Sequence, residues 1–342
     1  MSVTIYDIAE HARVSIATVS RVFNEHPRVS EGTRRRVFSV AERLGYEPHA
    51  SAQSLARQNT KLISAVVPMM TSFFFMEVIR GMQDRLDESD YDLLVYASRT
   101  IGKVDGPLAR AVQRGRADGL LLVSTPLTPA RARRLATSRR PVVLVDSHHD
   151  DFDSVSVDNR RGAAEAVRHL AERGHTRIGL ILPSEESVPA AERKAGYTEA
   201  LRGLGLACDE ACVVAAEWDR EQHGYTRYAG YRAMQRLLAL ETPPTAVFAA
   251  ADVMALGALR AIREAGLEGA AAPELVGFDD VASSAYVGLT TLRQPMYEMG
   301  KLAIEKLLRR IIAPETPPSH TVFAPRLVVR ETTGGPAPVL PT

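Results

Sequence analysis

The sequence predicts a small all-α N-terminal part followed by a larger α/β part built on parallel sheets. At 342 residues, the chain is too long for one ordinary hydrophobic core and indicates two or three domains. Residues 1–60 contain no convincing strand, and their apolar residues form short helical patterns separated by turn and cap residues. From Leu62 onward, short β-rich runs alternate with longer amphipathic stretches, which is typical of parallel sheets covered by helices.

The composition is that of a globular protein and limits the arguments about partners. Hydrophobic residues make up 45% of the chain and charged residues 24%. The formal net charge is only +1, so any case for a nucleic-acid partner must be local, and residues 1–60 hold eight Arg or Lys against six Asp or Glu. Cys208 and Cys212 are too few for a disulfide framework. With no signal-peptide pattern and no apolar run of about 18 residues, we expect a cytoplasmic protein.

Three helices are predicted in residues 1–47. Thr4 and Asp7 match a capping box, while Ser15 and Ser30 can cap a second and a third helix. The residues expected to face inward are Ile5, Ile8, Ala9, Ala12, Val19, Val22, Phe23, Val37, Val40, Ala41 and Leu44. Two short helices joined by a tight turn and braced by a third form a helix-turn-helix, whose second helix fits the DNA major groove. A small helical bundle that binds protein is the alternative.

The larger part contains a series of short apolar runs that predict buried strands. These runs are residues 62–68, 91–97, 118–124, 141–146, 177–181 and 245–250. Asp146, Asp252 and Asp279 follow strands, at the carboxyl ends where open α/β sheets gather ligands. Carboxylates accept paired hydrogen bonds from sugar hydroxyls in a shielded cleft, although an aspartate at a strand end can instead cap the next helix.

Residues 3–56 resemble the headpiece of the lactose-repressor (LacI/GalR) family. The elements T-I-Y-D-I-A, V-S-x-x-T-V-S-R-V and L-G-Y-x-P follow the family's order and spacing. One departure is Arg13, which stands in a turn where many relatives have glycine; a left-handed residue without glycine costs on the order of 1 kcal/mol. The resemblance continues to about residue 333. It implies a helix-turn-helix headpiece (1–47), a hinge helix and linker (48–60), a two-lobed periplasmic-binding-protein-like domain for effector binding and dimerisation (61–333) and a flexible tail (334–342).

The same resemblance implies which residues contact DNA. Ile16, Ala17 and Arg21 match base-reading positions, and Arg28 matches a loop position that approaches bases. The residues implied to lie near phosphates are Thr4, Tyr6, Ser15, Thr18, Ser20 and Asn24. Arginine can bind guanine with two hydrogen bonds, whereas isoleucine and alanine offer only apolar contact. Leu55 matches the hinge residue that enters the minor groove; the alternative is a linker residue packed on the next domain.

For the larger domain, the resemblance implies one lobe from residues 62–159 and 290–320 and another from residues 160–289 and the last strand. The crossovers between lobes are expected near Val157–Asn159, Leu289–Gln294 and His320–Phe323. Arg193 matches the family's ligand-gripping arginine, while Phe74 and Trp218 can either form apolar walls of the site or only pack. The expected effector-binding residues are therefore Phe74, Asp146, Arg193, Trp218, Asp252 and Asp279.

We therefore expect a homodimeric, sequence-specific repressor of carbohydrate-metabolism genes that leaves an inverted-repeat operator when a sugar or related metabolite binds. A regulator activated by a nucleobase-type corepressor is the alternative, although Ser147 offers no aromatic ring beside Asp146. A solute-binding transport component is a rival from another class, opposed by the headpiece and by the missing export signal. No phosphate-binding loop or nucleophile elbow is present, and residues 148–153 are interpreted as a polar loop. Neither an enzyme, a cofactor, a metal site nor a membrane partner is expected.

Overall fold

The computed structural model describes residues 3–23, 26–46, 59–70, 72–98, 103–138, 140–183, 187–216 and 224–336. The chain clusters into two compact units. One consists of Met1–Leu62 with Gln113–Asp118, and the other of Ile63–Val112 with Gly119–Thr342. The expected residues Asn24, Leu55 and Trp218 lie outside the described ranges.

The headpiece in the first unit is a three-helix domain. Its helices are α1 (Ile5–Ala12), α2 (Ile16–Phe23) and α3 (Glu31–Leu44). The predicted caps are confirmed: the Thr4 backbone N–H donates to Asp7 Oδ2 at 2.7 Å, and the hydroxyls of Ser15 and Ser30 each accept from the backbone N–H three residues later. Its core consists of Ile8, Ala9, Ala12, Val19, Val22, Phe23, Val37, Val40 and Ala41.

Arg13 ends the first helix in a left-handed conformation. Its φ and ψ are 51° and 50°, and its backbone N–H donates to the carbonyl oxygens of Ala9 and Glu10. Gly45 ends α3 in the same way, with φ 64°. Only glycine adopts this conformation without strain, so Arg13 carries the strain that its position in the turn predicts.

The second unit contains two lobes, each built on a six-stranded sheet. In lobe 1 the strand order is β11-β5-β4-β3-β1-β2, and in lobe 2 it is β12-β10-β9-β8-β6-β7. The strands of lobe 1 are β1 (Leu62–Pro68), β2 (Asp92–Ser98), β3 (Gly119–Val123), β4 (Val142–Val145), β5 (Asp153–Val157) and β11 (His320–Phe323). The strands of lobe 2 are β6 (Ile178–Leu182), β7 (Val213–Ala215), β8 (Ala246–Ala249), β9 (Glu274–Asp279), β10 (Thr290–Arg293) and β12 (Arg326–Val328). The pair β10–β12 is antiparallel, whereas β1–β3, β3–β4, β4–β5 and β5–β11 are parallel.

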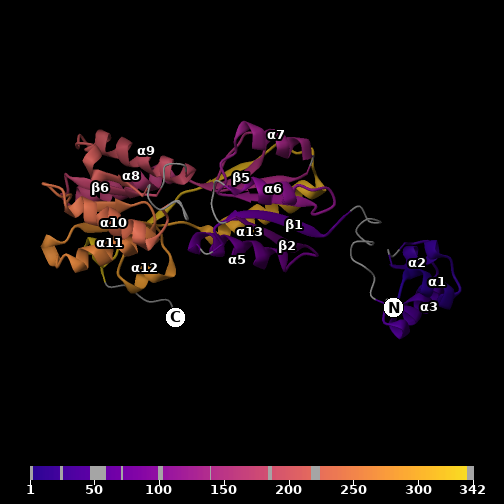
Figure 1. Cartoon of the computed structure of the whole chain (residues 1–342). Helices are drawn as coiled ribbons and strands as arrows, with labels where there is room; N and C mark the ends of the chain where they lie inside the picture. The colour runs from indigo at the N-terminus through magenta and orange to yellow at the C-terminus, as the bar shows by residue number, and fades with distance from the viewer. Residues whose placement is uncertain are drawn as a thin grey trace. The chain divides into compact units, whose positions relative to one another are not determined.

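Helices cover both faces of each sheet (Figure 1). In lobe 1, α6 (Asp105–Ala111) and α7 (Pro129–Ser138) cover one face, and α5 (Phe73–Leu86) and α13 (Met296–Ile312) cover the other. In lobe 2, α8 (Asn159–Glu172) and α9 (Val188–Gly203) lie opposite α10 (Arg227–Leu238) and α11 (Asp252–Glu264), and the short α12 (Ala282–Tyr286) follows β9. The predicted α/β architecture with parallel sheets is confirmed.

Glycine lets the paired helices approach one another closely. A Cβ added at Gly300 of α13 would collide with the carbonyl oxygen of Val78 in α5, and one at Gly81 would collide with that of Tyr297. A Cβ at Gly230 of α10 would meet the backbone of α11 in the same way. The helices therefore pack backbone against backbone at these points.

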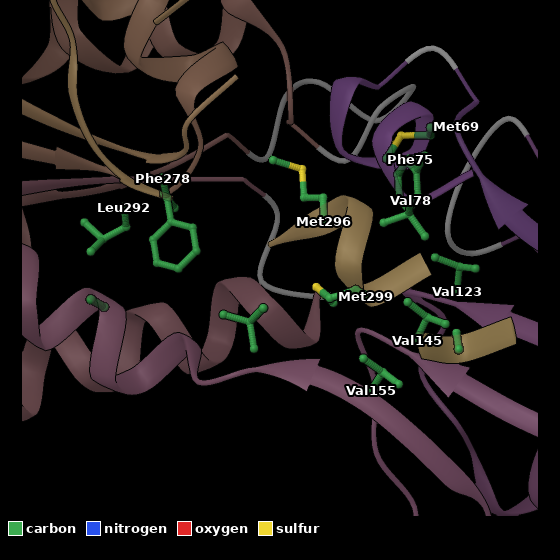
Figure 2. Close-up of a cluster of buried hydrophobic side chains, with 14 of the residues drawn as sticks. Met69, Phe75, Val78, Val123, Val145, Val155, Phe278, Leu292, Met296 and Met299 are labelled. Atoms are coloured by element: carbon green, nitrogen blue, oxygen red, sulfur yellow. The ribbon is translucent and has the colours of Figure 1, made fainter. Parts of the chain in front are cut away.

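One buried apolar cluster extends through both lobes. Figure 2 shows side chains of lobe 1 and of lobe 2 at opposite ends of the cluster, with methionines of α13 between them. The labelled members are Met69, Phe75, Val78, Val123, Val145, Val155, Phe278, Leu292, Met296 and Met299. The two lobes therefore share part of their hydrophobic core.

One expected lobe boundary differs from the observed one. Residues Thr290–Arg293 form β10 beside β9 in lobe 2, although the sequence placed residues 290–320 in lobe 1. The side chains of Thr290, Thr291 and Leu292 are completely buried there, which fixes this strand in the second sheet. The chain crosses to lobe 1 after Arg293 and returns after Phe323, so both crossovers, like the one after Val157, lie where they are expected.

Candidate functional site

The outer face of α2 presents the side chains expected to read DNA. Val19, Val22 and Phe23 are buried in the headpiece core, so the opposite side of the helix is free. Ile16 is 42% exposed, and Ala17 and Arg21 are also exposed. A helix that is buried on one face and carries an exposed arginine on the other has the geometry of a recognition helix.

The residues expected to contact phosphates, and the loop residue Arg28 that is expected to approach bases, lie around this helix. Tyr6 on α1 is 67% exposed, and Arg28 is exposed in the turn before α3. The hydroxyls of Ser15 and Thr18 lie 2.9 Å apart at the start of α2, and Ser20 is partly exposed. The Thr4 hydroxyl donates to Asp7 Oδ2 at 2.7 Å. Thus Thr4 and Ser15 also have a structural role, because they cap helices.

A cavity of about 210 Å³ lies between the two lobes, at the carboxyl ends of their strands. Lobe 1 contributes Met69, Ser72, Phe73, Phe74, Phe75, Ser124 and Asp146 to its wall. Lobe 2 contributes Ser187, Pro189, Arg193, Tyr225, Arg227, Val253, Leu256, Asp279, Val281 and Ser283, and Gln294 comes from the crossover after β10. The structure thus brings together four of the expected effector residues, namely Phe74, Asp146, Arg193 and Asp279.

Asp146 follows β4 and is a buried acid in the wall of this cavity. The Ser124 hydroxyl donates to its Oδ2 at 2.6 Å, whereas Oδ1 is buried without a hydrogen-bond partner among the described residues. Burial raises the pKa of the Asp146 carboxyl to about 6. A buried acceptor without a partner is costly, so this oxygen favours a ligand that donates a hydrogen bond.

Arg193 on α9 is held in place before any ligand binds. Its side chain donates to Asn159 Oδ1 at 2.9 Å and to the carbonyl oxygen of Ala250, and the guanidinium carbon lies 3.7 Å from the centre of the Phe278 ring. Only 3% of the residue is exposed. These contacts orient the guanidinium in the cavity wall.

Asp279 ends β9 on the lobe 2 side of the cavity. The Gln294 amide donates to its Oδ1 at 2.6 Å, and Arg193 lies 4.0 Å away. Burial raises the pKa of the Asp279 carboxyl to about 7 and outweighs the attraction of Arg193, whose hydrogen bonds go to other acceptors. The side-chain oxygen of Gln294 is buried without a partner among the described residues, so it adds a second free acceptor.

Strained backbone occurs around the cavity. Met69, Ser124, Asp146 and Asp279 all line it, and all have positive φ values, of 53°, 40°, 56° and 127°. Such conformations cost about 1–3 kcal/mol each and concentrate at binding sites.

The structure does not bring Asp252 to the cavity. Its carboxylate is completely buried at the start of α11 and accepts hydrogen bonds from the backbone N–H of Val281 and the hydroxyls of Ser284 and Thr291. These bonds join β10 and α12 to α11. The geometry therefore favours a structural role for Asp252 at the start of α11 over a role in ligand binding.

Several wall residues were not expected from the sequence. Ser124 is the last residue of a predicted strand and directly follows the observed β3, so its position was available as a signal. Gln294 lies at an expected crossover, but nothing in the sequence indicates that its amide faces Asp279. Tyr225, whose hydroxyl lies 2.9 Å from that of Ser187, follows no strand and has no comparable signal.

The described residues include no group of three or more His, Cys, Asp or Glu side chains placed to hold a metal ion. In the polar loop after β4, His148 Nε2 lies 3.0 Å from Asp150 Oδ1. Within the same ranges, no helix combines the length and the apolar character needed to cross a bilayer.

A helix-turn-helix headpiece attached to a two-lobed domain with a cavity between its sheets defines a ligand-responsive, DNA-binding transcriptional regulator. Residues 4–49 match the family model for bacterial regulatory proteins, lacI family, and residues 167–333 match that for a periplasmic binding protein-like domain. The chain belongs to the LacI family, as the sequence predicts.

The chain is similar to other proteins and to solved structures over nearly its whole length. Catabolite control protein A of Priestia megaterium is 34% identical over 339 residues, covering 97% of this chain and 100% of that protein. The HTH-type transcriptional repressor PurR of Escherichia coli is 34% identical over 334 residues, covering 96% of each. The crystal structure of the Lac repressor dimer bound to operator and the anti-inducer ONPF has a TM-score of 0.82 at 28% identity, with 97% of this chain and 99% of that chain covered. The complex of the transcriptional regulator CelR with cellobiose has a TM-score of 0.71 at 28% identity, with coverages of 96% and 99%.

Proposed function

We propose that this regulator is a homodimeric repressor of carbohydrate-metabolism genes, released from an inverted-repeat operator by a sugar or related metabolite. The buried oxygens of Asp146 and Gln294, which have no hydrogen-bond partner among the described residues, carry the proposal. Sugar hydroxyls donate hydrogen bonds to such acceptors and accept them from a fixed guanidinium such as that of Arg193. Cellobiose in the CelR complex supports this class of ligand. The cavity binds its ligand without catalysing a reaction, in line with the regulatory relatives, and the regulator acts in the cytoplasm, where its DNA is.

The proposed mechanism is a change in the angle between the lobes. A ligand held by Asp146 of lobe 1 and by Arg193 and Asp279 of lobe 2 favours the arrangement in which both lobes contact it. The crossovers absorb the rotation, as in hinge closure of two-lobed binding proteins. The ligand changes the free-energy difference between the two lobe arrangements by the difference between its binding free energies for them. In this proposal Leu55, which lies outside the described residues, wedges into the minor groove in only one of the arrangements.

The DNA half of the proposal is tested by selecting duplexes from a random pool with the full-length chain. The expected result is an enriched inverted repeat. Arg21→Ala should then weaken binding to the selected sequence by about 1–3 kcal/mol for each guanine that the arginine binds, and it should relax the preference at one position per half-site. Arg43→Ala, an exposed arginine in the last turn of α3, is the matched control. If no inverted repeat is enriched, with or without candidate metabolites, the proposal fails.

The effector half is tested by thermal unfolding with a panel of monosaccharides, disaccharides and nucleobases. A ligand at about 100 times its Kd adds about 2.7 kcal/mol to the stability of the folded state and raises Tm. Asp146→Asn should remove this increase, whereas Asp150→Asn, in the exposed loop nearby, should retain it. If only nucleobases raise Tm, the effector is of the nucleobase type and the sugar proposal is wrong. A response that Asp146→Asn leaves unchanged would exclude the cavity.

A further inference from the structure

The most basic part of the chain lies outside the headpiece. Residues 103–140 contain nine Lys or Arg and only two Asp or Glu, a net charge of +7, whereas the complete chain carries +1. Residues 1–60 carry only +2. The strongest local attraction for a polyanion is therefore expected on α6, α7 and the turns that follow them.

Three arginines of this segment are free to bind a partner. Arg110 lies in the last turn of α6, and Arg114 and Arg116 lie in the turn between α6 and β3. All three are exposed, and none forms an ion pair within the described ranges; Arg116 Nε donates only to Gln113 Oε1, at 3.3 Å. Their positive charge is therefore not neutralised by a nearby carboxylate.

The acidic residues close to these arginines are already engaged. Asp118 accepts hydrogen bonds from Thr60 N at 2.8 Å, from Thr60 Oγ1 at 2.9 Å and from Lys61 N at 2.9 Å. Asp105 pairs with Arg131, whose Nε lies 2.8 Å from its Oδ1. Helix α5 packs on the face of the sheet opposite α6, and within the described ranges none of its acidic residues forms an ion pair with Arg110, Arg114 or Arg116. The arginines therefore form a basic surface of their own.

Strand direction places this surface at the edge where the chain arrives from the headpiece. Strands β1, β3 and β4 are parallel, so their amino ends share one edge of the sheet, and the effector cavity lies at the other edge. Thr60 and Lys61 precede β1, and Arg114 and Arg116 precede β3. The chain from the headpiece therefore enters lobe 1 at the edge that carries Arg114 and Arg116.

We propose that Arg110, Arg114 and Arg116 bind the phosphate backbone of duplex DNA beside the sequence that the headpiece reads. DNA is the polyanion that this class of protein binds, and the chain that comes from the headpiece enters lobe 1 at this edge. The contacts are electrostatic and independent of sequence, because exposed arginines without a supporting base-reading element bind phosphates rather than base edges. This inference rests on DNA binding by the headpiece and extends the DNA-contacting surface to lobe 1.

The test measures binding of the full-length chain to random-sequence duplexes by fluorescence anisotropy over a series of salt concentrations. One duplex has about 20 base pairs, enough for two half-sites one helical turn apart, and the other about 40. The triple variant Arg110→Ala, Arg114→Ala and Arg116→Ala should bind the longer duplex roughly tenfold more weakly at about 0.1 M salt. The slope of log K against log salt concentration should fall by about 0.9 for each phosphate that the variant no longer neutralises. The shorter duplex should show little change.

Two further variants separate this surface from a general effect of charge. Arg168→Ala, Arg202→Ala and Arg263→Ala together remove the same charge from exposed positions of lobe 2 and should leave both slopes unchanged. Lysine at positions 110, 114 and 116 should restore the wild-type slope. Equal slopes for the wild type and the alanine variant would overturn the inference, as would a change in dimerisation by sedimentation with an unchanged slope. Failure of the wild type to bind either duplex would instead overturn the DNA-binding function itself.

Discussion

Replacing Asp279 with asparagine is expected to change how stability depends on pH. Burial raises the pKa of this carboxyl to about 7, whereas in the unfolded chain it titrates near its ordinary value of 3.8. Between about pH 4 and pH 7, the folded protein therefore holds a proton that the unfolded chain has lost. Through this window, the Asp279 contribution to the free energy of unfolding falls as the pH rises.

The size of the effect follows from the difference between the two pKa values. One pKa unit corresponds to about 1.36 kcal/mol, so about three units correspond to about 4 kcal/mol over the whole window. Between pH 5 and pH 8, the Asp279 contribution to the free energy of unfolding falls by about 3 kcal/mol. Asparagine keeps an oxygen that can accept the hydrogen bond from Gln294 but cannot ionise. Relative to the wild type, Asp279→Asn should therefore gain about 3 kcal/mol of stability between pH 5 and pH 8.

Urea unfolding at pH 5 and pH 8, followed by circular dichroism, measures this difference. Asp105→Asn is the control, because hydrogen bonding from Arg131 lowers the pKa of the Asp105 carboxyl. In both states the pKa of that carboxyl is at or below its ordinary value, so the control profile between pH 5 and pH 8 should match that of the wild type. Parallel profiles for Asp279→Asn and the wild type would refute the reasoning that burial keeps Asp279 protonated.

Two further predictions concern backbone conformation and helix packing. Arg13→Gly should raise the stability of the headpiece by roughly 1 kcal/mol, because glycine adopts the left-handed conformation of this position without strain. Thermal unfolding followed by circular dichroism at 222 nm (about the helical minimum) measures the change. A lower Tm would show instead that the arginine side chain stabilises the turn. Gly300→Ala should destabilise lobe 1 by about 1–3 kcal/mol in urea unfolding, because the added methyl meets the backbone of α5. Gly203→Ala, which has open space around it, is the control for Gly300, and equal effects of the two changes would contradict the close packing.

The parts of the fold that could be predicted are those set by local patterns. The apolar runs identified β1, β3 and β4 to within one residue at each end, and the caps at Thr4 and Ser15 were visible as short motifs. The strand β5 was missed because its sequence, DSVSV, is half polar although four of its five residues are buried. The position of β10 in the second sheet depends on its pairing with β9, which forms only when the sheet assembles. No local sequence pattern therefore predicts it.

The site shows the same division between local and non-local information. Asp252 and Asp279 both follow or end strands of lobe 2, yet only Asp279 lines the cavity. Asp252 instead accepts bonds from residues that come 29 to 39 positions later in the chain. The direction of a side chain at the end of a strand is decided by such distant partners. The sequence could therefore identify candidate carboxylates but could not separate the structural one from the wall residue.

The hydrogen bonds of Asp118 to Thr60 and Lys61 connect the effector domain to the chain that comes from the headpiece. One carboxylate fastens the last two residues of the connection from the headpiece, and the next residue along the chain begins the central strand β3. No slack segment separates the anchored connection from the sheet. A rotation of lobe 1 would therefore move Thr60 and Lys61 directly. Breaking this anchor should weaken the effect of the effector on DNA binding, while the protein remains able to bind the effector and DNA separately.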